Sequence, residues 1–236
     1  MNFLEGIKNL GLFFLSLLFP VACLVCGREN TYICQACLVQ LPRLDNQKCI
    51  RCQQPSAFGK THALCQSRNF ADGSISALNY KDPRVHKIVK VFKYNFVSDL
   101  SKPLADLLIE TIKNQELHGY FQNFTIVPVP LHSKRHNWRG FNQAEFLSDA
   151  LAQALAIPVE KHLVMRRKST KPQVRLTAKE RKRNMENAFA LVQSPANKKI
   201  LLVDDVITSG ATLNELAKLL KKHKAAEVWA LTVAHG

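Results

Sequence analysis

The chain has 236 residues, of which 47% are hydrophobic and 22% are charged, and its formal net charge is +15. The composition is ordinary for a globular protein and gives no reason to expect a fibrous or low-complexity chain. The length is sufficient for one medium α/β domain and a small additional module. The high positive charge favours polyanionic ligands such as pyrophosphates or nucleic acid, but a charge sum alone does not choose between them.

The N-terminal segment is apolar, and we predict that residues 3–19 form a helix that packs on the protein. The run Leu10–Phe19 is too short to span a bilayer. The sequence Phe19–Cys23 superficially resembles a lipoprotein cleavage site, but Pro20 stands where an aliphatic residue is expected and Lys8 alone is a poor positive region. We therefore expect no integral membrane span and a cytoplasmic location, with a membrane-surface role as the alternative.

Six of the seven cysteines form three Cys-x-x-Cys pairs, and His62 precedes Cys65 by the same interval. Paired in order, they give two sets of four ligands, as a tetrahedral structural Zn²⁺ requires. The first set is Cys23, Cys26, Cys34 and Cys37, and the second is Cys49, Cys52, His62 and Cys65. Disulfides or redox thiols are the alternatives, but the odd cysteine count and the paired spacing favour two structural zinc ions. We expect residues 1–68, the helix and both zinc sites, to form one domain and residues 69–236 the other.

The first half of the larger domain shows a strand and two helices. Residues 70–80 alternate weakly and predict a strand, whereas residues 85–92 have the apolar spacing of an amphipathic helix. The opposite face of this helix is basic and is interpreted as solvated, with an anion-binding surface as the alternative; it carries Arg84, Lys87, Lys90 and Lys93. Ser101 is predicted to cap the next helix.

A strand at residues 124–127 is followed by a basic loop over residues 131–142 and by a helix through Ala144 and Leu155. Arg139 and Gly140 precede this helix, where backbone amides can meet an anion. Another strand is predicted at residues 162–166. The polar, basic segment 167–187 is predicted to be a long loop, which serves as a solvated lid, a pyrophosphate clamp or a nucleic-acid arm.

The most informative stretch is residues 200–212. Its four apolar residues predict a strand buried on both faces in a parallel sheet. Asp204 and Asp205 follow at the carboxyl end, where open α/β sheets bind ligands. Next comes a small loop suited to a phosphate, made of Thr208, Ser209, Gly210, Ala211 and Thr212. The capping-box spacing of Thr212 and Glu215 predicts that a helix starts there. A Walker B strand or an aspartate phospho-acceptor is the alternative, but the chain has no GxxxxGK[ST] loop.

This stretch closely resembles the fingerprint with which type I phosphoribosyltransferases bind 5-phosphoribosyl 1-pyrophosphate (PRPP). The resemblance implies that Asp204 and Asp205 hold the ribose hydroxyls and that Thr208 to Thr212 cradle the 5′-phosphate. It also implies that Mg²⁺-bound pyrophosphate leaves C1 of PRPP, and that Mg²⁺, Arg139 and loop residues such as Lys171 or Arg175 neutralise its charge. Gly140 is then one of the PRPP-binding residues. In this reading residues 167–187 would be the loop that closes over the substrate.

The whole chain resembles the ComF family. The matching segments are Leu18 to Pro20, Phe92 to Tyr94, Val127 to Leu131, Arg139 to Gln143, Lys171 to Gln173, Arg181 with Asn184, and the strand 200–212. The resemblance implies an α/β fold, namely a type I phosphoribosyltransferase domain with a Rossmann-like parallel sheet and flanking helices, preceded by a small double zinc ribbon. It links the chain to DNA uptake, with PRPP and single-stranded DNA or DNA-processing proteins as partners, and gives no acceptor substrate.

Two functions therefore remain open at this point. The first is a phosphoribosyltransferase, for which Asp204, Asp205 and Arg139 would be catalytic. The second is a non-catalytic, nucleic-acid-associated module in which the PRPP site is regulatory. Aromatic residues make up only 8% of the chain and do not interleave with the basic segment, which disfavours a stacking platform for nucleic acid.

Overall fold

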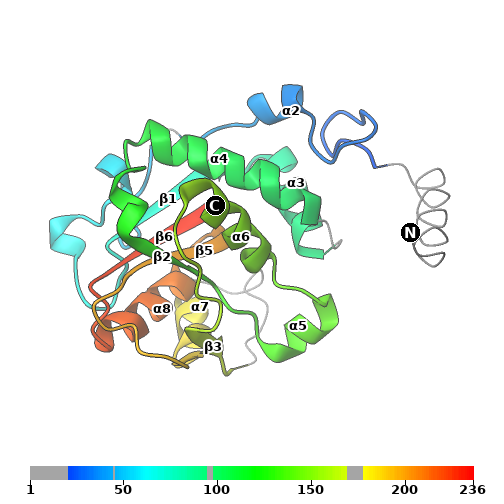
Figure 1. The fold of residues 1–236 in the computed structure, drawn as a ribbon. Helices are drawn as coiled ribbons and strands as arrows, with labels where there is room; N and C mark the ends of the chain where they lie inside the picture. The colour runs from blue at the N-terminus through cyan, green and yellow to red at the C-terminus, as the bar shows by residue number, and fades with distance from the viewer. Residues whose placement is uncertain (1–20, 45, 95–97, 169–177) are drawn as a thin grey trace. The chain divides into compact units, whose positions relative to one another are not determined.

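The computed structural model describes residues 21–44, 46–94, 98–168 and 178–236 (Figure 1). The predicted helix over residues 3–19 lies outside this range, as do Lys171 and Arg175. The chain forms two compact units, divided between Leu41 and Pro42. The described part of the first unit carries four cysteines and one helix, α2 (Gln35–Val39). The predicted domain boundary after residue 68 stays a prediction.

The second unit is built on a four-stranded sheet in the order β1-β6-β5-β2, in which all neighbouring strands are parallel (Figure 1). The strands are β1 (Gly73–Asn79), β6 (Glu227–His235), β5 (Lys199–Ile207) and β2 (Phe124–Pro128). Strand β5 lies between two parallel neighbours, and its residues 200–203 are fully buried. The predicted central strand and the α/β fold class are therefore confirmed. Strand β6 was missed, although its apolar run is a strand signal.

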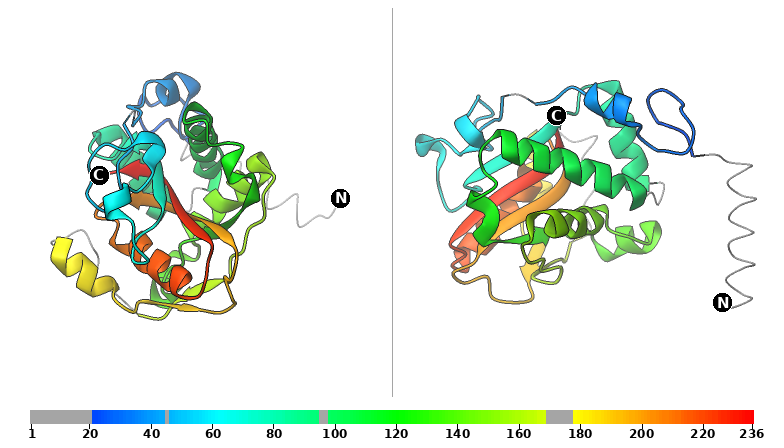
Figure 2. Two further views of the ribbon diagram at one scale, coloured as in Figure 1. Left: turned by 90° about the vertical axis from the view of Figure 1, so that its left-hand side faces the viewer. Right: turned by 45° about the horizontal axis from the view of Figure 1, so that its top comes forward.

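Helices cover both faces of this sheet, as the two views of Figure 2 show. Ile200 and Leu202 belong to a core cluster with Leu213, Leu216 and Leu220 of α8 (Ala211–Lys222). The intervening residues of β5 point to the opposite face, because side chains alternate along a strand. That face is covered by α4 (Ser101–Asn114) and α6 (Gln143–Leu155). Helix α3 (Pro83–Tyr94) follows β1 in the chain and confirms the amphipathic helix predicted there.

Three predictions about local structure were wrong. The segment 131–142 is not a simple loop but contains α5 (Ser133–Arg139), whose N-cap His132 accepts a hydrogen bond from the backbone N–H of Lys134. Helix α7 (Ala178–Met185) lies within the segment predicted as a loop over 167–187. Ser101 is the first residue of α4 and not its cap, because the turn Ser98–Leu100 leads directly into the helix and Leu100 holds the N-cap position.

The short strand β3 (Val164–Arg166) confirms the strand predicted at residues 162–166, whereas β4 (Phe189–Leu191) was not predicted. They pair antiparallel in a small sheet of their own. Short 3-10 turns complete the unit at Ala57–Gly59, Ala63–Cys65 and Tyr120–Asn123. Within the described residues, no helix is long and apolar enough to cross a membrane.

Candidate functional site

The candidate site forms at the carboxyl edge of the parallel sheet. Strand β5 extends to Ile207, so Asp204 and Asp205 lie inside the C-terminal part of the strand and not beyond its end. Asp205 is 3% exposed, whereas Asp204 is half-buried. Helix α3 follows β1, and the α5–α6 segment follows β2, so side chains from both can reach the same edge.

Asp205 is held by side chains from two helices. Lys93 of α3 places its Nζ 3.0 Å from Oδ1 of Asp205, and Gln143 of α6 donates a hydrogen bond of 2.7 Å from Nε2 to Oδ2. Arg139 donates in turn to Oε1 of Gln143 over 3.2 Å and is only 8% exposed. The basic face of α3 is therefore not uniformly solvated as expected: Lys93 is paired with the buried acid.

The two acids have unequal electrostatic surroundings. Burial and the charge of Asp205 raise the pKa of Asp204 to about 7, against the lowering effects of Lys93 and Arg166. Burial alone would lower the pKa of Lys93, but the carboxylates of Asp205 and Asp204 raise it above its ordinary value. Arg166, at the end of β3, is 9% exposed and lies over the ring of Phe189. Lys93 and Arg166 thus supply positive charge beside the acid pair.

The raised pKa of Asp204 predicts a pH effect on stability. Between about pH 4 and pH 7 the native state binds more protons at Asp204 than the unfolded chain, so the free energy of unfolding should fall as pH rises through this window. The slope is at most about 1.4 kcal/mol per pH unit. Denaturant unfolding of Asp204→Asn should lack this contribution, and in Lys93→Met the window should extend to higher pH. A difference between Asp204→Asn and wild type that is independent of pH would contradict the assignment.

The loop after β5 has the features of an anion site. Gly210 holds the N-cap position of α8 with φ of 69°, a left-handed conformation that favours glycine. The Oγ atom of Ser209 is buried and has no hydrogen-bond partner among the described residues. Helix α8 therefore starts at Ala211, and the capping box predicted for Thr212 and Glu215 was wrong. Glu215 instead accepts a hydrogen bond of 2.8 Å from the backbone N–H of Asn187.

The structure thus brings together only part of the predicted site. Arg139 reaches the acid pair through Gln143, and Gly140 is the C-cap of α5 in a left-handed conformation. Sequence reasoning placed Lys93 on a solvated or anion-binding basic face and assigned no individual role to Gln143 or Arg166. Lys93 and Gln143 lie in segments that match the family, Phe92 to Tyr94 and Arg139 to Gln143, and this match could have indicated a role for both. Arg166 carried no signal in the sequence.

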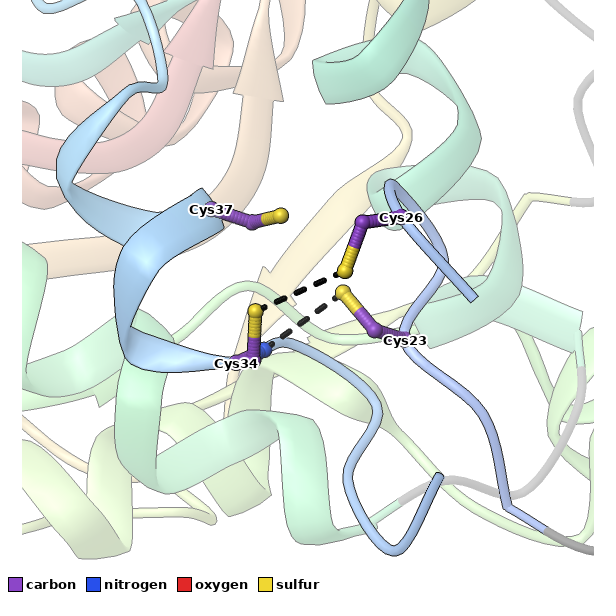
Figure 3. A group of neighbouring side chains, drawn as sticks. All are labelled: Cys23, Cys26, Cys34 and Cys37. Carbon is purple, nitrogen blue, oxygen red and sulfur yellow. Dashed lines mark hydrogen bonds between the residues drawn. The ribbon is translucent and has the colours of Figure 1, made fainter. Parts of the chain in front are cut away.

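The first cysteine group has the geometry of a tetrahedral metal site. The sulfur atoms of Cys23, Cys26, Cys34 and Cys37 turn toward one centre (Figure 3) and lie within 4.8 Å of one another. The Sγ atoms of Cys26 and Cys34 are 3.7 Å apart. A tetrahedral Zn²⁺ with Zn–S bonds of about 2.3 Å requires a sulfur–sulfur separation near ~3.8 Å. All seven cysteines are free, and this group fits zinc.

The second group combines three cysteines with His62, and its four ligand atoms also lie within 4.8 Å of one another. Nδ1 of His62 lies 3.4 Å from Sγ of Cys52, while Nε2 lies 3.0 Å from the carbonyl oxygen of Pro55. A hydrogen bond from Nε2–H to this carbonyl leaves the Nδ1 lone pair free for a metal, as in many histidine–zinc sites. The residues fit a second structural zinc.

Two family models match the chain. A double zinc ribbon domain matches residues 14–67, and a phosphoribosyl transferase domain matches residues 141–236. The first match contains both cysteine groups. The second contains α6, the acid pair and the loop 208–212.

Curated proteins similar to most of the chain have names that refer to competence or to DNA utilization. Competence protein F of Haemophilus influenzae is 39% identical over 62% of this chain and 67% of its own length. DNA utilization protein YhgH of Escherichia coli (strain K12) is 32% identical over 84% of this chain and 89% of its own length. Competence protein ComFC of Bacillus subtilis is 27% identical over 87% of this chain and 85% of its own length.

Among solved structures, a hypoxanthine phosphoribosyltransferase from Staphylococcus aureus is similar at 17% identity with a TM-score of 0.35. The similarity covers 59% of this chain and 62% of that one.

Proposed function

This chain belongs to the ComF family, and we propose that its larger domain binds PRPP and transfers or recognises the phosphoribosyl group with pyrophosphate as leaving group. One observation carries the proposal. An acid pair, of which Asp205 is buried and Asp204 half-buried, and a glycine-containing loop with an unsatisfied Ser209 hydroxyl lie in the same strand–loop–helix segment. Carboxylates suit a ribose diol, and a loop at a helix N-terminus suits its phosphate.

Each side chain has a distinct task in this proposal. Asp204 and Asp205 accept hydrogen bonds from the ribose hydroxyls. Their negative charge stabilises the positive charge that builds on the ring as pyrophosphate leaves. Lys93 and Gln143 hold Asp205 in place. Arg139 positions Gln143 and, with Lys171 or Arg175, is proposed to neutralise pyrophosphate. The described residues suggest no general base for an acceptor.

Mg²⁺ is proposed to arrive with the substrate. Among the described residues, groups of three or more metal-binding side chains occur only at the two cysteine groups. Both carboxylate oxygens of Asp205 are already engaged by Lys93 and Gln143, whereas Asp204 is half-buried. These residues fit a Mg²⁺ ion held mainly by pyrophosphate oxygens and water, which is usual for this ion. When bound, it would reduce the charge of the leaving pyrophosphate.

The alternative is a non-catalytic, nucleic-acid-associated module in which the PRPP site is regulatory. The net charge of +15 and the names of the relatives favour a role with single-stranded DNA or DNA-processing proteins. A cytoplasmic location is proposed from the reduced, zinc-suited cysteines. Isothermal titration with Mg²⁺-PRPP, with and without single-stranded DNA, tests both functions. Absence of any heat of binding with Mg²⁺-PRPP would reject the proposed ligand.

The segment 167–187 gives a prediction that separates the two functions. If it closes over PRPP, hydrogen exchange of its amides should slow when Mg²⁺-PRPP is added, because a lid contacts bound ligand. If it is a nucleic-acid arm, DNA alone should protect it and affinity should fall steeply with salt. Neutralising Arg181, Lys182 and Arg183 should then reduce the slope of log affinity against log salt concentration by about two if all three contact phosphates. Protection by DNA and none by Mg²⁺-PRPP would contradict the lid.

A further inference from the structure

We infer that the Cys49–Cys52 knuckle of the second cysteine group positions the phosphate loop 208–212, chiefly through Ile50. The inference rests on the proposed function for the role of the loop. The knuckle lies in the same compact unit as the sheet. Ile50, between the two cysteines in sequence, is 1% exposed and belongs to the core cluster that includes Ile207 and Leu213.

Ile50 lies beside Gly210 and leaves no room there for a larger residue. A Cβ atom added to Gly210 would lie 3.2 Å from Cγ1 and 3.4 Å from the carbonyl oxygen of Ile50. Ile50 therefore occupies the space into which a side chain at Gly210, the N-cap of α8, would project. The carbonyl of Gly210 accepts a hydrogen bond of 2.8 Å from the backbone N–H of Asn214. Gly210 is held between the knuckle and the first turn of the helix.

A second link joins the knuckle to the strand ends. Nε2 of His235 lies 2.9 Å from Oε1 of Gln53, the residue after Cys52. Burial and the charge of Lys48 lower the pKa of His235 to about 4, so the neutral ring donates from Nε2–H to the amide oxygen. His235 pairs with Ile207 in the sheet, and Gly236 donates its N–H to the carbonyl of Ile207 over 2.9 Å. The knuckle thus contacts the loop and braces the strand end from which the loop begins.

Backbone hydrogen bonds of Cys49 define the conformation of the knuckle. The backbone N–H of Gln53 donates to the carbonyl of Cys49, and the N–H of Cys49 donates to the carbonyl of Gln54, each over 2.9 Å. Ile50 and Gln53 are therefore carried on a tight turn whose two cysteines point to one metal centre. Ile50 is therefore a positioning residue, because it would act on a bound phosphate only through the loop 208–212.

The test compares a graded series at Ile50 with the same series at a matched site. Ile50→Val and Ile50→Ala loosen the contact with Gly210 in steps. Ile112→Val and Ile112→Ala make the same changes at a fully buried isoleucine of α4, on the opposite face of the sheet. Hydrogen exchange of amides 208–214 is measured without ligand, and the affinity for ribose 5-phosphate is measured by isothermal titration, both on folded full-length protein.

In the order wild type, Ile50→Val, Ile50→Ala, we expect hydrogen exchange of amides 208–214 to accelerate and the affinity for ribose 5-phosphate to fall. For Ile50→Ala each change should be about tenfold, which is within the usual range of coupling between sites. The Ile112 variants should lose stability and keep both properties. If Ile50→Ala does not fold, the same comparison is made between Ile50→Val and Ile112→Val. Unchanged loop exchange and affinity in the Ile50 variants would overturn the inference and leave the proposed function standing. Accelerated loop exchange in a protein that does not bind ribose 5-phosphate would overturn the proposed function while supporting the positioning role.

Discussion

Replacing Asp204 and Asp205 together by asparagine is expected to weaken binding of Mg²⁺-PRPP by two or more orders of magnitude. The change preserves size and shape but removes both negative charges. Each lost charge-assisted hydrogen bond to a ribose hydroxyl costs about 1.5–3 kcal/mol, and every 1.4 kcal/mol is about tenfold in affinity. The measurement is isothermal titration of the folded double variant against wild type.

The double variant also leaves Lys93 without its carboxylate partner, so its folding has to be checked by circular dichroism before the titration. Asp149→Asn is a suitable control, because this acid pairs with Lys161 in a half-exposed salt bridge and such pairs contribute little to stability. The control should bind Mg²⁺-PRPP as wild type does. Unchanged affinity in the folded double variant would place the ribose site elsewhere.

Disruption of the first metal site should have the largest effect on the protein as a whole. Cys34→Ser is expected to leave the chain poorly soluble, because structural Zn²⁺ contributes about 10–16 kcal/mol of binding free energy that is available only to the folded site. The residues 21–41 contain few other buried side chains with which to compensate. Wild-type protein purified without chelator should contain two Zn²⁺ per chain by metal analysis.

Val39→Ser provides the matched control for this prediction. Val39 lies in the same unit as Cys34 and is 66% exposed, so its replacement should leave both solubility and zinc content unchanged. Metal analysis that finds no zinc, or a mapped disulfide between Cys23 and Cys26, would refute the assignment of this group as a zinc site.

Several features could be predicted because they depend on residues close together in sequence. The Cys-x-x-Cys spacing places two side chains on one turn, so the members of both cysteine groups could be predicted without a structure. The fully apolar run Ile200 to Val203 has no solvent-facing side and therefore predicted the central strand. Helix starts were less secure. The Thr212 and Glu215 pattern has the right spacing for a cap, but the N-cap of α8 is the left-handed Gly210, two residues earlier.

The sequence by itself thus determined the α/β class, the composition of the two metal groups and the acid pair with its loop, since each is a local pattern with a direct physical meaning. Only the tertiary structure decided which distant side chains complete the site. Lys93 meets Asp205 although β6 lies between β1 and β5 in the sheet. Ile50 meets Gly210 because the second knuckle packs into the same core as α8. Such contacts depend on strand order and on side-chain packing across the whole unit, so no local sequence pattern predicts them.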